Sequence, residues 1–143
     1  LMQALSFVAT LFITAHSDEI TQLPGQPAVD FKQYSGYVEI NSTSKASIFY
    51  WFQECESGVE QCPLFLWTNG GPGCSGLQGA LTEQGAFRIQ PNGTLALNPH
   101  RWNKHVNIVF IEQPIGVGFS TSTDANDYIS GDQKSAQEIY QFI

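Results

Sequence analysis

The stretch WTNGGPGCSG at residues 67–76 directly follows the apolar run PLFLW at 63–67. Glycine adopts backbone conformations that other residues avoid, and proline lacks the N–H that the interior of a helix or strand requires, so this stretch cannot continue a regular element. The continuous apolar run is typical of an interior strand that is covered on both faces. The sequence therefore predicts a glycine-lined loop, with uncommitted backbone N–H groups, at the end of a buried strand.

Other segments on both sides of this loop predict further strands. The ranges 34–40 and 46–53 alternate or are rich in aromatic and β-branched residues, and STSK between them is typical of a turn. The range 106–114, VNIVFIEQP, predicts another strand that ends at Pro114. A second glycine-rich loop, IGVGFSTS, follows at 115–122.

Two helices are expected beside these strands. A short helix is predicted over 77–85, where Gly85 ends it. A second helix is expected to begin with a capping residue at Ser130 or Asp132, and its apolar residues at helical spacing are Ala136, Ile139, Tyr140 and Ile143. Strands followed by a strand–loop–helix unit, and then by another strand and helix, indicate an α/β fold.

The charge composition excludes one class of partner. The 143 residues contain 6 Lys and Arg against 13 Asp and Glu, which gives a net charge of −7. Because so few scattered basic residues cannot neutralise a phosphate backbone, nucleic acid is not expected as a partner. The sequence has no CxxC pairs and no clustered histidines, so no metal site is predicted, and no cofactor is expected. The sequence does not specify an oligomeric state.

The amino terminus resembles a secretory signal. The segment 1–15 is apolar, and Ala15-His16-Ser17 places small residues at the two positions that a signal peptidase reads. This apolar segment is shorter than the roughly 20 residues that span a bilayer. We therefore predict a leader over 1–17, of which the basic region is missing, and a mature chain over 18–143 without a membrane span. The alternative is an N-terminal core helix.

Cysteines and two sequons are consistent with export. Cys55 and Cys62 flank ESGVEQ between two strand-like runs, and this spacing predicts a disulfide across a hairpin. Cys74 lies in the glycine loop and has no local partner, so its partner is expected elsewhere. Asn41 and Asn92 each begin a triplet that matches the glycosylation acceptor pattern, which matters only in a secreted chain.

Several motifs in the same order resemble the serine carboxypeptidases. They are NGGPGCSG at 69–76, EQGAF at 83–87 and NPHRWNKHVNIVFIEQPIGVGFS at 98–120, and LPGQPAVDFKQYSGYV at 23–38 resembles the family's mature start. Together they cover roughly residues 22–143. The resemblance implies an α/β-hydrolase fold and a Ser–Asp–His triad that removes C-terminal residues from peptides and proteins. It also implies a lysosomal, vacuolar or extracellular location.

The chain itself does not contain that triad. The family's nucleophile lies in a Gly-Glu-Ser-Tyr-Ala-Gly elbow, which this resemblance places beyond residue 143, with the Asp and His later still. Ser75 and Ser120 each follow a glycine by two positions but lack the glycine two positions later that completes G-x-S-x-G. We therefore expect an N-terminal portion of the hydrolase domain that is inactive alone.

The resemblance assigns roles to residues around the glycine loop. Gly71 is implied to donate an N–H to the oxyanion of the reacting acyl group, because a glycine leaves the acyl oxygen unobstructed. Asn69 and Glu83 are implied to bind the substrate carboxylate, with Gly70 in the same loop and Trp67 supporting them. A carboxylic acid donates a hydrogen bond only while protonated, which favours acidic conditions. Cys74 matches a cysteine whose partner lies in the absent C-terminal part.

Three alternatives stay open. Acyltransferases of the same fold commonly carry Thr where this chain has Asn69, so Asn69 favours the peptidase. A catalytically inactive homologue could act as a binding module, since the triad lies outside the sequence. A shortened gene product without function is the third. The chain also departs from the family pattern at Thr68, Gly76 and Thr121, where Leu, Ser and Tyr are common.

Overall fold

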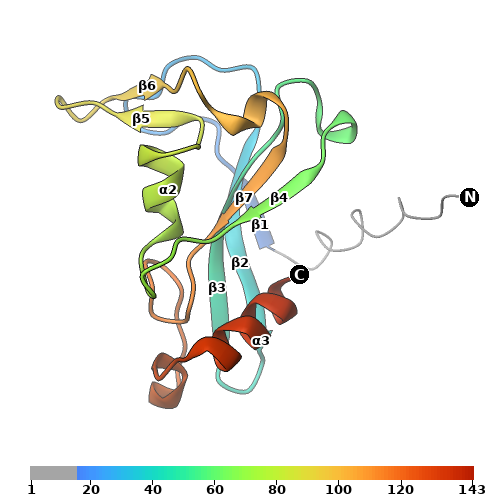
Figure 1. Cartoon of the computed structure of the whole chain (residues 1–143), viewed down its shortest axis with the longest axis vertical. Coiled ribbons are helices and arrows are strands. Elements are labelled where there is room, and N and C mark those ends of the chain that lie inside the picture. Colours follow the sequence, from blue (N-terminus) through green and yellow to red (C-terminus); the bar gives the residue numbers. More distant parts are fainter. Residues whose placement is uncertain (1–15) are drawn as a thin grey trace, which may run out of the picture.

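The computed structural model describes residues 16–143. Five strands form one sheet in the order β1-β2-β3-β7-β4, and two short strands form a second (Figure 1). The strands are β1 (His16–Glu19), β2 (Gln33–Asn41), β3 (Ala46–Gln53), β4 (Leu64–Trp67), β5 (Phe87–Ile89), β6 (Leu95–Leu97) and β7 (Asn107–Ile111). The helices are α2 (Gly76–Thr82) and α3 (Asp132–Phe142), and 3₁₀ turns span Val59–Gln61, Trp102–Lys104 and Ala125–Tyr128.

The larger sheet is mixed, as the α/β prediction requires. β1 with β2, β2 with β3, and β3 with β7 pair antiparallel, whereas β4 runs parallel to β7. The predicted strands at 34–40, 46–53 and 106–114 correspond to β2, β3 and β7. All residues of β7 are buried, and β7 lies between β3 and β4 in the sheet.

The prediction that the apolar run before the glycine loop is covered on both faces is wrong for the described residues. Leu64, Phe65 and Leu66 of β4 are 41%, 44% and 36% exposed. The reason is topological: β4 is the last strand in the order and pairs only with β7 among residues 16–143. A continuous apolar run marks burial in a complete sheet, and here that sheet has an open edge.

Side chains that alternate along β3 and β7 build a core on each face of the sheet. One cluster contains Ile48 and Tyr50 and is closed by Phe142 of α3. The other contains Trp51 and is closed by Ala80 of α2. The two helices therefore cover opposite faces, α2 beside the glycine loop and α3 across the lower end of the sheet in Figure 1.

Both helices differ in detail from the predictions. α2 ends at Thr82, earlier than the predicted stop at Gly85. Gly85 serves packing instead, because a Cβ there would lie 1.9 Å from the carbonyl oxygen of Ala80. The predicted cap of the second helix, at Ser130 or Asp132, is also wrong: α3 begins at Asp132, and its N-cap is Gly131, which has no side chain to make a capping bond.

The predicted apolar stripe of α3 is also wrong in part. Its buried side chains are Glu138 and Phe142, and Ile139 packs against the core only partly. Tyr140 and Ile143 are 83% and 60% exposed. The helical spacing of the apolar residues predicted the helix correctly, but it did not predict which side of the helix faces the core. The buried Glu138 occupies part of that side.

The predicted leader lies mostly outside the described residues. His16 and Ser17, at its predicted end, belong to β1, where they pair with Tyr37 and Gly36 of β2. The leader and its boundary stay predictions. Among residues 16–143, no helix combines the length and the hydropathy that crossing a membrane requires.

Candidate functional site

The loop that joins β4 to α2, residues 68–75, depends on glycine at its centre. It is called the oxyanion loop below, after the role that the sequence analysis predicts for it and that stays a prediction. Gly71 has φ +132°, and a Cβ there would lie 3.0 Å from both the backbone nitrogen and the Sγ of Cys74. The N–H of Cys74 donates to the carbonyl of Gly70 at 3.1 Å. Gly71 is an exposed residue, and within residues 16–143 no hydrogen bond uses its N–H. The loop therefore has the uncommitted donor that its sequence predicts.

Asn69 is oriented by the indole of Trp67. The Nε1–H of Trp67 donates to Oδ1 of Asn69 at 2.7 Å. An indole nitrogen only donates, so the atom facing it must be the amide oxygen rather than the amide nitrogen. This contact uses the acceptor of Asn69 and leaves its NH₂ group as the donor that points elsewhere.

Helix α2 packs directly against this pair. A Cβ on Gly79 would lie 2.5 Å from Nε1 of Trp67 and 2.7 Å from Oδ1 of Asn69. The ring of Trp67 also meets Trp102 edge-on, with centroids 5.8 Å apart and planes at 86°. Trp67 is therefore fixed on two sides, and only a glycine at position 79 leaves room for its bond to Asn69.

Glu83 caps the other end of α2. Its backbone N–H donates to the carbonyl of Gly79 at 3.0 Å, and its own carbonyl accepts from the Asn98 amide at 3.0 Å and from the Arg88 guanidinium. The residue is exposed, and no hydrogen bond joins its carboxylate to Asn69 within the described part of the chain. The structure thus brings Trp67 and Asn69 into contact, whereas no hydrogen bond within residues 16–143 joins Glu83 to either of them.

A second set of contacts ties the oxyanion loop to α3. Nε2 of Gln113 donates to Oγ1 of Thr68 at 2.6 Å, and the Ser135 hydroxyl of α3 donates to Oε1 of Gln113. Thr68 is one of the positions that departs from the family pattern, and a Leu there would offer Gln113 no acceptor. Sequence reasoning missed this link, because nothing local connects residues so distant in the chain.

The predicted disulfide between Cys55 and Cys62 is present, with Cα atoms 6.3 Å apart. The prediction that it crosses a hairpin is wrong, since β3 and β4 are separated in the sheet by β7. The disulfide instead closes the crossover loop between them. The side chain of Asn107 holds that loop by accepting from the N–H of Cys55 and donating to the carbonyls of Val59 and Cys62. Cys74 is unpaired and exposed in the described chain.

Both sequon asparagines are exposed: Asn41 is the last residue of β2, and Asn92 lies in the turn between β5 and β6. Oδ1 of Asn41 accepts from the N–H of Thr43 at 3.0 Å, and Oδ1 of Asn92 accepts from the N–H of Thr94 at 3.1 Å. These bonds occupy the amide oxygen and not the amide nitrogen to which a glycan would be joined. Glycosylation at Asn41 and Asn92 stays a prediction.

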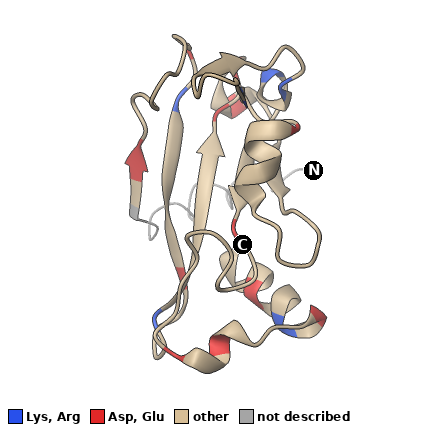
Figure 2. Cartoon of the chain, turned by 90° about the vertical axis from the view of Figure 1, so that its left-hand side faces the viewer, with Lys and Arg blue, Asp and Glu red and all other residues tan. Residues whose placement is uncertain are grey.

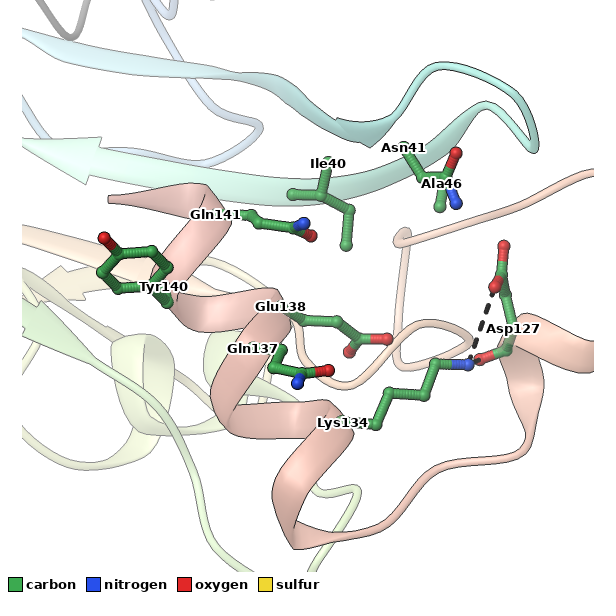
Figure 3. Close-up of a pocket in the computed structure, with 9 residues that line it drawn as sticks. All are labelled: Ile40, Asn41, Ala46, Asp127, Lys134, Gln137, Glu138, Tyr140 and Gln141. Carbon is green, nitrogen blue, oxygen red and sulfur yellow. Dashed lines mark hydrogen bonds and ion pairs between the residues drawn. The ribbon is translucent and has the colours of Figure 1, made fainter.

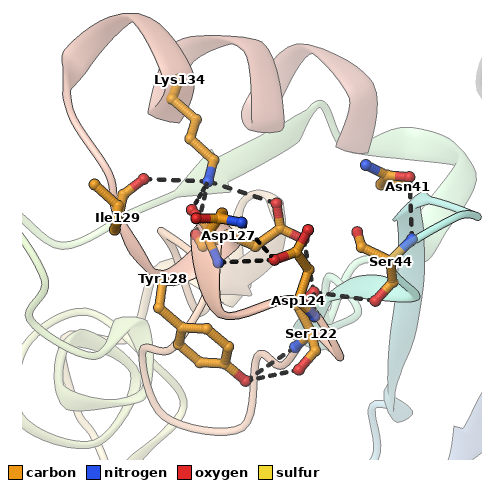
Figure 4. Close-up of polar contacts among 9 residues, drawn as sticks. Asn41, Ser44, Ser122, Asp124, Asp127, Tyr128, Ile129 and Lys134 are labelled. Carbon is orange, nitrogen blue, oxygen red and sulfur yellow. Dashed lines mark hydrogen bonds and ion pairs between the residues drawn. The ribbon is translucent and has the colours of Figure 1, made fainter.

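On the face of the larger sheet that α3 covers, opposite to α2, Lys134 connects α3 to the segment 122–129. Its Nζ donates to the carbonyls of Asp127 and Ile129 at 2.8 and 3.2 Å and pairs with Oδ1 of Asp127 at 3.6 Å (Figure 4). Oδ2 of Asp127 accepts from the Ser122 hydroxyl at 2.6 Å. That hydrogen bond is the main reason why the pKa of Asp127 lies below its ordinary value.

Beside this contact lies a hollow of about 440 Å³ between α3 and the turn that joins β2 to β3. Figure 3 shows Asn41 and Ile40 on one side of it, with Lys134 and Glu138 on the other. Glu138 is buried, and its Oε2 has no hydrogen-bond partner within the described residues. Burial raises the pKa of Glu138 above its ordinary value.

The charges on the described residues form no basic patch. Lys and Arg lie at separate places along the chain, interspersed with Asp and Glu (Figure 2). No group of His, Cys, Asp and Glu able to hold a metal ion occurs among residues 16–143. The features that stand out chemically are therefore the oxyanion loop and the residues that fix it.

A mixed sheet with a strand–loop–helix crossover, and a glycine loop where the strand ends, defines this chain as part of an α/β-hydrolase fold. The serine carboxypeptidase family model matches residues 24–143, and the chain belongs to that family. It is 46% identical over 125 residues to serine carboxypeptidase-like 45 from Arabidopsis thaliana, covering 86% of this chain and 27% of that protein. It is 44% identical over 147 residues to serine carboxypeptidase-like 32 from Arabidopsis thaliana, covering 96% and 32%.

The structure is similar to the crystal structure of a prohormone-processing carboxypeptidase from Saccharomyces cerevisiae. The TM-score is 0.64 at 29% sequence identity, over 78% of this chain and 26% of that one. The chain therefore spans about a third or less of the length of these relatives.

Proposed function

We propose that the protein carrying this chain is a serine-type carboxypeptidase that releases C-terminal residues from peptides and proteins. In this proposal the described segment supplies two parts of the site: Gly71 donates an oxyanion N–H, and Asn69 with Gly70 and Glu83 binds the substrate carboxylate. The triad Ser, Asp and His come from outside the 143 residues. Residues 18–143 alone are expected to release no C-terminal amino acids, and measurable release by the pure segment would contradict this division of the site.

The observation that carries the proposal is the bond from Trp67 to Asn69. It fixes the amide with Oδ1 toward the indole and leaves the NH₂ group of Asn69 available as a donor, which is what recognition of a carboxylate requires. A plain strand–helix turn has no need of a fixed amide, nor of a glycine at position 79 to make room for it. Gly71, an exposed residue, lies in the same loop, two residues further on.

Export along the secretory pathway, to a lysosome or vacuole or to the exterior, is part of the same proposal. Its support is the Cys55–Cys62 disulfide, because disulfides persist in oxidising compartments. Exposed sequon asparagines and the apolar segment at 1–15 agree with it.

The test compares matched substrates in the full-length protein. Asn69→Ala should weaken a peptide with a free C-terminus by about 1.5–3 kcal/mol in kcat/KM, the usual worth of a hydrogen bond to a charged group. The corresponding peptide amide lacks the carboxylate and should lose much less. An equal loss for acid and amide would refute the role of Asn69.

Two results would redirect the proposal to its alternatives. Transfer of an acyl group to an alcohol or amine in preference to water would indicate an acyltransferase. A full-length protein without the nucleophile elbow, but with measurable affinity for peptide C-termini, would indicate an inactive homologue that binds them.

A further inference from the structure

We propose that Glu112 is a positioning residue, which holds the C-terminal end of the oxyanion loop in place and thereby aims the N–H of Gly71. The inference rests on the proposed function, since it concerns the same loop. Glu112 directly follows β7 in the sequence and is fully buried. Sequence reasoning gave it no role, although an acid at the end of an otherwise apolar run was a visible signal.

Both carboxylate oxygens of Glu112 accept hydrogen bonds, one from the end of the oxyanion loop and the start of α2, the other from the second glycine-rich loop. Oε1 accepts from the Ser75 hydroxyl and from the N–H of Leu77 at 3.2 Å, and Oε2 accepts from the N–H of Phe119 at 3.2 Å. Ser75 is the last residue of the oxyanion loop, and Phe119 lies in the second glycine-rich loop. One side chain therefore joins the two glycine-rich loops.

Two glycines make space for this arrangement. A Cβ on Gly118 would lie 1.0 Å from Oε2 of Glu112, so the carboxylate occupies the place of a side chain at that position. A Cβ on Gly76 would lie 2.1 Å from the carbonyl oxygen of Ile111. Both loops approach the end of β7 as closely as a backbone allows, and neither can move without breaking a bond to Glu112.

These contacts complete the fixation of the oxyanion loop. Its N-terminal end is held by the Trp67–Asn69 bond and its C-terminal end by Ser75 on Glu112. Gly71 lies between these two ends and makes no hydrogen bond of its own through its N–H within residues 16–143. The direction of that N–H is therefore set by the two ends, and loss of either lets the donor turn away from the oxyanion.

The chemistry requires a carboxylate rather than an amide. The N–H groups of Leu77 and Phe119 are obligate donors that reach different oxygens, so both oxygens must accept. Glutamine would turn an NH₂ group toward one of these donors. No salt bridge reaches Glu112 among the described residues, and the charge is met by the hydrogen-bond donors alone.

The test uses Glu112→Gln in the full-length protein, with kcat and KM measured for a peptide acid and its amide. A misaimed donor costs transition-state stabilisation and not ground-state binding, so kcat should fall about tenfold to a hundredfold for both substrates, with KM nearly unchanged. The matched control is Glu138→Gln, which alters another buried glutamate that makes no hydrogen bond or salt bridge to the oxyanion loop within residues 16–143 and should leave kcat unchanged.

A second variant keeps the test decisive if Glu112→Gln does not fold. Ser75→Ala removes one of the donors to Glu112 and should lower kcat about threefold to tenfold by the same pattern, consistent with the loss of one hydrogen bond. Wild-type kcat in a folded Glu112→Gln protein, or a loss confined to KM, would overturn the inference. An inactive wild-type protein would instead overturn the proposed function.

Discussion

The two helices cover opposite faces of one sheet, but they are held in different ways. On the α2 face the decisive contacts are close backbone approaches, at Gly76 against Ile111 and at Gly79 against Trp67. On the α3 face they are charged side chains, with Lys134 bound to the 122–129 segment. We therefore expect the packing of α2 to be disrupted by the addition of a single methyl group. The contacts of α3 should instead depend on the ionisation of its charged side chains.

The largest effect is expected from Gly71→Ala in the full-length protein. The added Cβ would meet the backbone of Cys74 at 3.0 Å, in a backbone conformation that alanine rarely adopts, so the loop must move its N–H. Loss of one oxyanion donor typically lowers kcat about 10²- to 10³-fold, and here the loss should be equal for a peptide acid and its amide. The measurement is kcat for both substrates.

The control for this comparison is Gly131→Ala, at the start of α3. Its backbone φ is extended and a Cβ there would have no neighbour within 4 Å, so kcat and the unfolding temperature should stay near wild type. If Gly131→Ala lowered kcat as much as Gly71→Ala does, close packing would not distinguish the two faces.

A smaller and more selective effect is expected from Gly79→Ala. Its Cβ would push between Nε1 of Trp67 and Oδ1 of Asn69, separating the two without touching Gly71. We expect kcat/KM for a peptide acid to fall about tenfold, which is 1.4 kcal/mol, while the amide changes little. The discriminating outcome is the ratio of acid to amide, and a parallel fall of both would show that this contact does not orient Asn69.

Local patterns in the sequence predicted much of this molecule. The alternation along β3 and the glycines of the oxyanion loop are properties of a few neighbouring residues, and the disulfide joins cysteines only seven positions apart. Such features depend little on the rest of the chain. The sequence therefore predicted the positions of the strands, the glycine-rich loop and the disulfide.

The errors share a different origin. The pairing of β4 with β7, the open edge of the sheet and the roles of Glu112 and Lys134 all depend on contacts between distant segments. A glutamate in an apolar run looks the same whether it faces solvent or binds the N–H of a residue in another loop. Only the folded arrangement shows which donors reach it.

The smallest effect concerns ionisation on the α3 face. Burial raises the pKa of Glu138, so its neutral form is favoured in the folded state; stability from this residue is complete below the ordinary pKa of a glutamate and is lost as pH rises through the raised value. The groups that face it are Lys134, which opposes this shift, and Asp127, which adds to it. The unfolding temperature of Glu138→Gln, measured relative to that of the wild type, should therefore increase as the pH rises from acidic to neutral.

Asp127 should show the opposite sign on the same face. Its pKa is lowered, first by the Ser122 hydroxyl, so its contribution is present above the ordinary pKa of an aspartate and is lost as pH falls through the lowered value. Asp127→Asn should cost stability at neutral pH but not in strong acid, and by less than about 1 kcal/mol, because partly exposed ion pairs are worth little. Unfolding temperatures measured from acidic to neutral pH should make the two variants diverge from wild type in opposite directions. Parallel curves would show that α3 is held by packing, as α2 is, and that ionisation does not distinguish the two faces.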